Sequence, residues 1–184
     1  MDGPFYVDTR APHITADFAA ATLTATNTFL LPTGNLPVLG SNYFGYIGKL
    51  VRITMFGRMT CAAAAGTLNL SLLWGNNTAN NGTNLASTGN LALVNSATNI
   101  TWQAQWWVRC RAIGASGQLM CIGTMNANPA LILSTAQPIM IPPSAPAVAS
   151  VDLTLANVLS PQASCGTSTT NTMTIHEFIF EALN

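Results

Sequence analysis

Residues 101–126 read TWQAQWWVRCRAIGASGQLMCIGTMN, and this stretch decides the fold. Apolar residues occupy every even position from Trp102 to Ala112, and mostly polar residues lie between them. An alternation of period two is typical of a half-buried β-strand. The sequence GASG at 114–117 then forms a turn, and QLMCIGTMN returns as a second strand. The stretch therefore predicts a β-hairpin.

Apolar matching across this hairpin predicts its register. Folding it symmetrically about Ala115 and Ser116 gives these pairs: Cys110 with Cys121, Ala112 with Leu119, Trp106 with Met125, and Val108 with Gly123. Such cross-strand matches set the register of an antiparallel pair. The two cysteines are then neighbours, and we expect packed thiols rather than a disulfide because we expect a reducing compartment.

The rest of the chain reads as further strands joined by loops rich in Gly, Pro and Asn. Residues 49–61, 67–74, 150–155 and 171–183 alternate in the same way. The last of these changes phase after Ile175, which indicates either a bulge or a strand with two buried faces. No long stripe of period 3.6 predicts a helix. We therefore predict an all-β fold, an antiparallel β-sandwich of seven or eight strands that is jelly-roll-like.

The first seventeen residues differ from the rest, and we predict two parts: an extended N-terminal arm at 1–17 and a sandwich domain at 18–184. The arm holds two prolines, the aromatic pair Phe5 and Tyr6, and four charged residues, namely Asp2, Asp8, Arg10 and Asp17. Disordered tails tend to lack aromatic residues. The pair Phe5 and Tyr6 therefore favours an arm that docks onto a partner over a frayed terminus.

Charge is scarce throughout the chain. Six acidic and six basic residues give a net charge of zero, and Lys49 is the only lysine. Soluble domains carry about a quarter charged residues, and a net charge near zero favours association. The composition therefore predicts a surface that is covered by other copies of the chain or by a larger assembly. The even balance of charge argues against binding to nucleic acid, which needs clustered Lys and Arg.

The sequence offers no recognisable catalytic or cofactor site. His176 and Glu177 are adjacent and so point to opposite faces of a strand, and the four cysteines lack the spacing of a zinc site. Cys165, which we expect in a loop, has no partner that would make it a nucleophile. Phosphate-binding glycine motifs are absent. We predict a protein that is not an enzyme and that takes neither a metal nor a cofactor.

The candidate site is an interaction surface. Trp107 lies on the outward face of its strand with Arg109 and Arg111, and aromatic and Arg side chains are enriched at interfaces. The predicted interface residues are listed together: Phe5, Tyr6, Arg10, Trp107, Arg109 and Arg111. The first thirteen residues lack the pattern of a signal peptide, and no apolar run is long enough to span a membrane. We expect synthesis in a cytoplasm and no membrane partner.

Several segments resemble a known class of proteins. They are GYIGKLVRITMFGRM at 45–59, GTLNLSLLWG at 66–75, WQAQWWVRCRAIGASGQL at 102–119, and the closing pattern SVDLTLANVL and NTMTIHEFIFEALN. Their order resembles the jelly-roll structural proteins of tailed bacteriophages, above all the decoration proteins that cement the capsid. The resemblance implies a homo-oligomer, often a trimer, on the outside of the capsid, bound to the major capsid protein. It implies no catalytic residue.

Two alternatives remain open. One is a coat protein that builds the shell itself, although the arm is not basic as arms that contact packaged nucleic acid often are. The other is a carbohydrate-binding module that uses exposed aromatic residues such as Trp107, Tyr43 or Tyr46.

Overall fold

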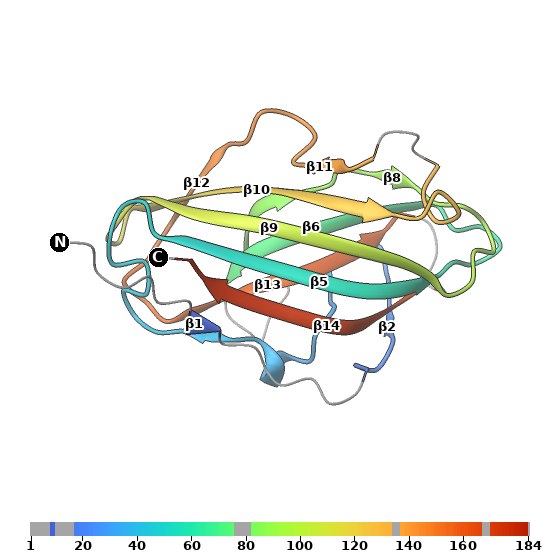
Figure 1. The fold of residues 1–184 in the computed structure, drawn as a ribbon, viewed down its shortest axis with the longest axis horizontal. Helices are drawn as coiled ribbons and strands as arrows, with labels where there is room; N and C mark the ends of the chain where they lie inside the picture. The colour runs from blue at the N-terminus through green and yellow to red at the C-terminus, as the bar shows by residue number, and fades with distance from the viewer. Residues whose placement is uncertain (1–7, 10–16, 76–81, 134–136, 167–169, 184) are drawn as a thin grey trace.

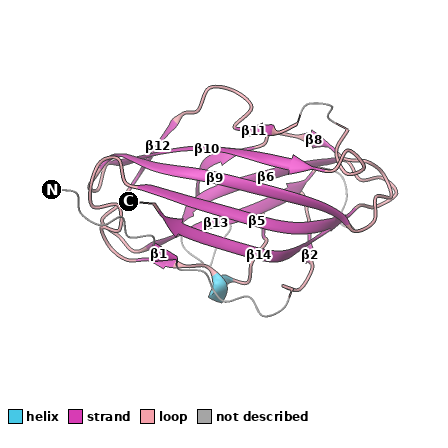
Figure 2. Ribbon diagram, viewed as in Figure 1, coloured by secondary structure: helices cyan, strands magenta, loops and turns pink. Residues whose placement is uncertain are grey.

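A computed structural model describes residues 8–9, 17–75, 82–133, 137–166 and 170–183. Figure 1 shows two layers of strands, and Figure 2 colours the short helical turn η1 in cyan. The elements, in chain order, are β1 (Asp8–Thr9), β2 (Ala21–Thr22), β3 (Thr28–Phe29), the 3-10 turn η1 (Thr33–Asn35), β4 (Val38–Leu39), β5 (Leu50–Thr60), β6 (Thr67–Gly75), β7 (Thr83–Ser87), β8 (Leu91–Ala92), β9 (Ile100–Ala112), β10 (Gly117–Ala127), β11 (Ile139–Ile141), β12 (Val148–Val151), β13 (Asn157–Cys165) and β14 (Thr172–Ala182).

The strands form two antiparallel sheets. The large sheet has the order β1-β14-β5-β9-β10-β11, with β2 also on β14 and β12 also on β10. The small sheet has the order β3-β13-β6-β7, with β4 also on β13 and β8 also on β6. The predicted all-β sandwich is confirmed.

The path of the chain through the two sheets is that of a jelly roll. Strands β2, β14, β5 and β9 lie side by side in the large sheet, and β3, β13, β6 and β7 lie side by side in the small one. The chain thus crosses repeatedly from sheet to sheet, and its last strand returns to lie beside the first. Eight strands wound in this way make the two Greek keys of a jelly roll. Strand β10 extends the large sheet beyond this set of eight.

The core lies between the sheets and is built from the inward positions of each strand. Its largest fully buried side chains include Trp106, Phe44, Phe178 and Phe180. In β5 and β9 burial alternates along most of the strand, as the sequence pattern predicts. The predicted bulge in β14 is confirmed, because its register against β5 shifts between Ile175 and Glu177.

The predicted register of the β9–β10 hairpin is wrong by two residues. Cys110 lies opposite Leu119, and Cys121 lies opposite Val108. The turn is closed by a hydrogen bond from the Gly117 N–H to the Gly114 carbonyl, and Gly114 has a φ of 90°. A bulge beside this turn adds to the shift. The cysteines stay on one buried face but are not directly opposite each other, and both are free thiols.

The three other predicted pairs, Ala112 with Leu119, Trp106 with Met125 and Val108 with Gly123, are also wrong. Ala112 lies opposite Gln118, and Arg111 is the extra residue that β9 carries at this point. Trp106 lies opposite Gly123 rather than Met125, which lies opposite Ala104.

The predicted strand at 150–155 is shorter than expected. Strand β12 ends at Val151, and Leu155 is exposed. The carboxylate of Asp152 accepts hydrogen bonds from both the backbone N–H and the hydroxyl of Thr154, at 2.8 and 2.6 Å. A local side-chain bond of this kind competes with the strand and produces a turn.

Cys165 ends β13 and is buried, so its expected place in a loop is wrong. The sequence hides this strand because Pro161 lies in its middle, and proline is unusual in a central strand. The carbonyl of Pro161 accepts a bond from the N–H of Leu30, which lies next to β3. In an antiparallel strand the N and the carbonyl of one residue point to the same side. The absent N–H therefore faces the β3 side, and the ladder with β6 is preserved.

Two parts of the predicted arm are described. Asp8 and Thr9 pair with Ala182 and Glu181 at the edge of β14, and Asp17 contacts the outer face of the same sheet. The division between arm and domain at residue 17 stays a prediction.

Candidate interaction surface on the large sheet

The outer face of the large sheet carries an apolar groove at the end that bears the β9–β10 turn. The groove has a volume of about 420 Å³, and its lining residues are Leu50, Trp107, Arg109, Met120 and Ile122. We call this set the apolar groove.

Strand register explains why these residues meet. Ile122 of β10 lies opposite Trp107 of β9, and Met120 lies opposite Arg109, which faces Leu50 of β5. All five positions point away from the core, because inward and outward side chains alternate along a strand. The groove is therefore formed by three adjacent strands.

The apolar groove leaves large apolar side chains in contact with water. Ile122 is 39% exposed and Val148, which lies opposite Met120 on β12, is 45% exposed. Trp107 is half-buried. Contiguous exposed apolar surface on a soluble domain marks an interaction site.

Arginine side chains border the apolar groove. Arg109 and Arg111 are exposed, and the Arg111 Nη2 lies 3.1 Å from the sulfur of Met120. Among the described residues neither guanidinium is paired with a carboxylate. Arg52, opposite Trp107 on β5, differs from them because its Nε donates to Glu181 Oε2 at 2.6 Å. That hydrogen bond raises the pKa of Arg52.

The structure brings three of the predicted interface residues together. Trp107, Arg109 and Arg111 share the outer face, as expected from the alternation in β9. Phe5, Tyr6 and Arg10 lie outside the described residues. Sequence reasoning missed the other three lining residues, Leu50, Met120 and Ile122. Each of them stands at an outward position of a predicted strand, so the alternation indicates an exposed side chain. Only the correct strand register shows that these side chains lie beside Trp107.

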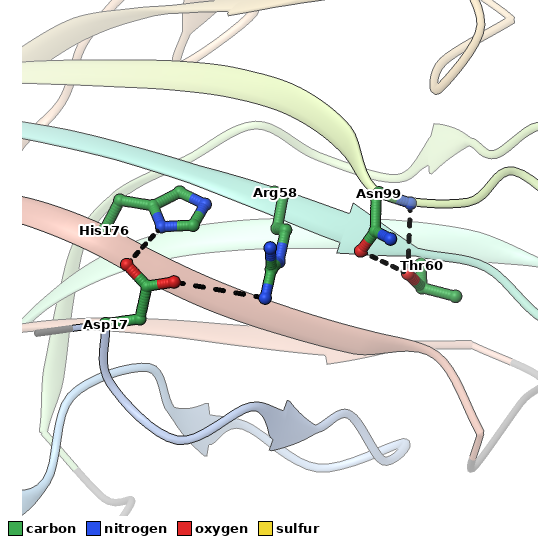
Figure 3. Close-up of polar contacts among 5 residues, drawn as sticks. All are labelled: Asp17, Arg58, Thr60, Asn99 and His176. Carbon is green, nitrogen blue, oxygen red and sulfur yellow. Dashed lines mark hydrogen bonds and ion pairs between the residues drawn. The ribbon is translucent and has the colours of Figure 1, made fainter.

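A polar cluster ties the chain near Asp17 to the outer face of the large sheet (Figure 3). The Asp17 Oδ1 lies 2.6 Å from Nδ1 of His176 on β14, and its Oδ2 lies 4.0 Å from Nη2 of Arg58 on β5. Beside it, the Thr60 hydroxyl accepts a bond from the Asn99 backbone N–H at 3.1 Å. The described residues place no hydroxyl or thiol in hydrogen-bonding contact with His176. The pair therefore acts as a surface contact.

A second groove lies at the opposite end of the same outer face, and four of its lining residues carry amide side chains. Its volume is about 450 Å³, and its lining residues are Phe56, Thr101, Trp102, Gln103, Asn126, Ala127, Asn128 and Gln137. Phe56, Gln103 and Asn126 are cross-strand neighbours in one row. We call it the amide groove.

The four cysteines are free and buried. Burial raises the pKa of Cys61 to about 11 and that of Cys121 to about 12. Burial also raises the pKa of the Cys110 and Cys165 thiols. Only the thiolate is a nucleophile or a metal ligand, and burial disfavours the thiolate form of all four cysteines.

Among the described residues, no group of three or more His, Cys, Asp or Glu is placed to hold a metal ion. The same residues include no helix with the length and apolar character needed to cross a membrane. In comparisons with known proteins, no family model matches the chain, and no curated protein matches it.

Proposed function

We propose that the chain is a structural virion protein that decorates and stabilises a phage capsid as a homo-oligomer, in the simplest case a homotrimer. In this proposal it binds the major capsid protein on the outside of the shell, and it has no catalytic activity. The observation that carries the proposal is the apolar groove: Trp107, Met120 and Ile122 form an open patch on the broad face of a sandwich with very few charges. A partner that covers this face removes apolar surface from water, which stabilises the assembly.

Three further observations support a structural role. The jelly-roll path is a common architecture of viral capsid domains. The charge balance of zero favours association over free diffusion. The one described histidine, His176, contacts Asp17 at the surface rather than in a pocket.

The assembly state of the purified chain tests the proposal. Native mass spectrometry and electron microscopy should show a stable trimer that does not grow into particles. Closed particles would instead favour the alternative coat protein that builds the shell itself. A monomer at micromolar concentration would contradict both.

Attachment to capsids tests the partner. Capsids prepared without the chain should bind it in a co-sedimentation assay, and deletion of residues 1–17 should abolish this binding while circular dichroism still shows a folded β domain. Full decoration by the truncated chain would contradict a role of the arm.

The amide groove favours a second candidate function, binding of a neutral saccharide. Gln103 and Asn126 offer donors and acceptors without charge, their side chains make no hydrogen bond to other described residues, and Phe56 supplies an apolar ring beside them. Titration with maltohexaose, cellohexaose and chitotetraose tests this function, with Asn126→Ala as the loss variant. Absence of heat and of chemical-shift change with all three sugars would remove this candidate.

A further inference from the structure

We infer that one end of the sandwich binds the surface of an anionic lipid bilayer through three apolar loop tips, Ile47, Ile113 and Leu155. We call these three side chains the tip surface. None of them lines the apolar groove, so the inference is independent of the proposed self-association. The expectation of no membrane partner rests on the lack of an apolar run that could span a bilayer, and contact through loop tips needs no such run.

Three loops meet at the end of the sandwich where β9 turns into β10 (Figure 1). They are residues 40–49, residues 113–116 and residues 152–156. Backbone hydrogen bonds join them: the Asn42 N–H donates to the Leu153 carbonyl, and the Leu153 N–H donates to the Gly114 carbonyl, both at 3.1 Å. The loops therefore form one connected unit, and each of them contributes one residue to the tip surface.

The tip surface consists of large aliphatic side chains that lie mostly in water. Ile47 is 67% exposed, Leu155 is 58% exposed and Ile113 is 53% exposed. None of the three lines the apolar groove or the amide groove. Exposed apolar side chains that gather in one place mark an interaction site. The tips therefore protrude toward a partner instead of enclosing one.

The loop that carries Ile47 is held in place from inside. Phe44 is buried in the core, and the Lys49 Nζ donates to the Tyr43 carbonyl at 2.7 Å and lies 3.8 Å from the centroid of the Tyr43 ring. A loop anchored in this way loses little conformational entropy when its tip is bound. Tyr46, beside the tip, is 46% exposed, and tyrosine is enriched where a bilayer meets water.

The charges near the tip surface favour an anionic partner. Arg109 and Arg111 approach Ile113 along the same strand, are exposed, and are paired with no carboxylate among the described residues. The acid of the third loop is Asp152, whose carboxylate accepts two hydrogen bonds from Thr154. Two guanidinium groups beside one carboxylate leave an excess of positive charge. Basic groups next to inserted apolar residues are attracted to anionic headgroups.

The shape of the tip surface favours a bilayer over a folded partner. Protein interfaces are packed as closely as protein interiors, so a protein would need a separate hollow for each of the three tips. The boundary between headgroups and acyl chains deforms around each tip and accepts apolar side chains at this depth. A lipid surface therefore satisfies all three tips without a matched shape.

Flotation with vesicles tests the inference on the full chain. The chain should float with vesicles made of equal parts of phosphatidylcholine and phosphatidylglycerol, and Ile47→Ala should lower its partition coefficient roughly tenfold, because less apolar surface is inserted. Arg111→Gln should lower it about fivefold, and only with anionic vesicles. Leu133→Ala is the matched control, since Leu133 is 66% exposed and bonds to Ala92 at the other end of the sandwich.

A probe at the tip surface distinguishes insertion from adsorption by charge alone. Ile113→Cys labelled with the environment-sensitive dye NBD should become brighter and shift to the blue with the anionic vesicles. Wild-type chain taken through the same labelling gives the background from the four native cysteines. An unchanged NBD spectrum on bound vesicles, or equal losses in Ile47→Ala and Leu133→Ala, would overturn the inference.

Failure of this inference is distinguishable from failure of the proposed function. A wild-type chain that forms the expected oligomer but floats with no vesicle would overturn the lipid partner and leave the proposed function standing. Capsid binding that is lost in Ile47→Ala, without vesicle binding by the wild type, would also overturn it and assign the tip surface to a protein partner.

Discussion

Trp106 lies directly opposite Gly123 across the β9–β10 hairpin. A Cβ atom added at Gly123 would collide with the carbonyl oxygen of Gln105 and would lie 3.0 Å from the ring of Trp106. Gly57 on β5 has the same relationship to Trp102, whose ring atoms would lie 3.0 and 3.1 Å from an added Cβ. The two inward tryptophans of β9 thus lie against glycines on opposite neighbouring strands.

Gly123→Ala tests this packing. We expect a loss of about 1–3 kcal/mol in the free energy of unfolding, because the added methyl group forces the Trp106 ring or the β9 backbone to move. Urea unfolding followed by tryptophan fluorescence measures the change. Gly40→Ala is the matched control, since an added Cβ there meets no atom within 4 Å. Equal stabilities of the two variants would refute the packing role of Gly123.

The same pair of residues shows where sequence reasoning succeeded and where it stopped. Alternation along β9 correctly placed Trp102 and Trp106 inside and Trp107 outside, because burial on one face determines the period of two. It did not reveal that Trp106 faces Gly123, because apolar matching favoured Met125 as the partner. A large ring beside a glycine fills the same space as two medium side chains. Matching apolar residue to apolar residue does not detect such a pair.

Two other errors have local causes. Strand β13 was not predicted because it contains Pro161. The missing N–H of Pro161 leaves the ladder with β6 intact because that side of the residue faces β3. The strand at 150–155 was overextended because the turn formed by Asp152 and Thr154 depends on side-chain hydrogen bonds that the alternation does not report. The candidate site was predicted through Trp107, but its lining from β5 and β10 depends on the pairing of three strands.

The buried thiols predict a loss of stability at high pH. Burial raises the pKa of Cys61 from 9.0 to about 11 and that of Cys121 from 9.0 to about 12. Below pH 9 the thiols are protonated in both the folded and the unfolded chain, and their contribution to the free energy of unfolding is fully present. Above pH 9 the unfolded chain loses them first, so the stability decreases as the pH rises through this range to about 12. Urea unfolding at pH 8 and pH 10.5 measures the decrease.

Cys121→Ala is the control for the thiol prediction. It removes one titrating group, so its stability should fall less steeply between pH 8 and pH 10.5 than that of the wild type. An identical pH dependence in both proteins would show that Cys121 does not contribute to the decrease.

The contact between Asp17 and His176 predicts a local effect. Asp17→Ala should change the free energy of unfolding by less than about 1 kcal/mol, because surface ion pairs contribute little. It should nevertheless speed amide hydrogen exchange at Phe18, whose N–H donates to the Ile175 carbonyl beside the lost contact. Arg58→Ala removes the longer contact, at 4.0 Å, and should have a smaller effect. Unchanged exchange at Phe18 in Asp17→Ala would contradict this role.

The central claim is that a partner copy covers the apolar groove, and the mass of the native particle tests it most directly. Wild-type chain at micromolar concentration should have the mass of an oligomer, and Ile122→Asp should have the mass of a monomer, because it places a charge in the covered groove. Leu155→Asp, at an exposed position that does not line the groove, should keep the wild-type mass. An Ile122→Asp variant that keeps the full oligomeric mass would contradict the account.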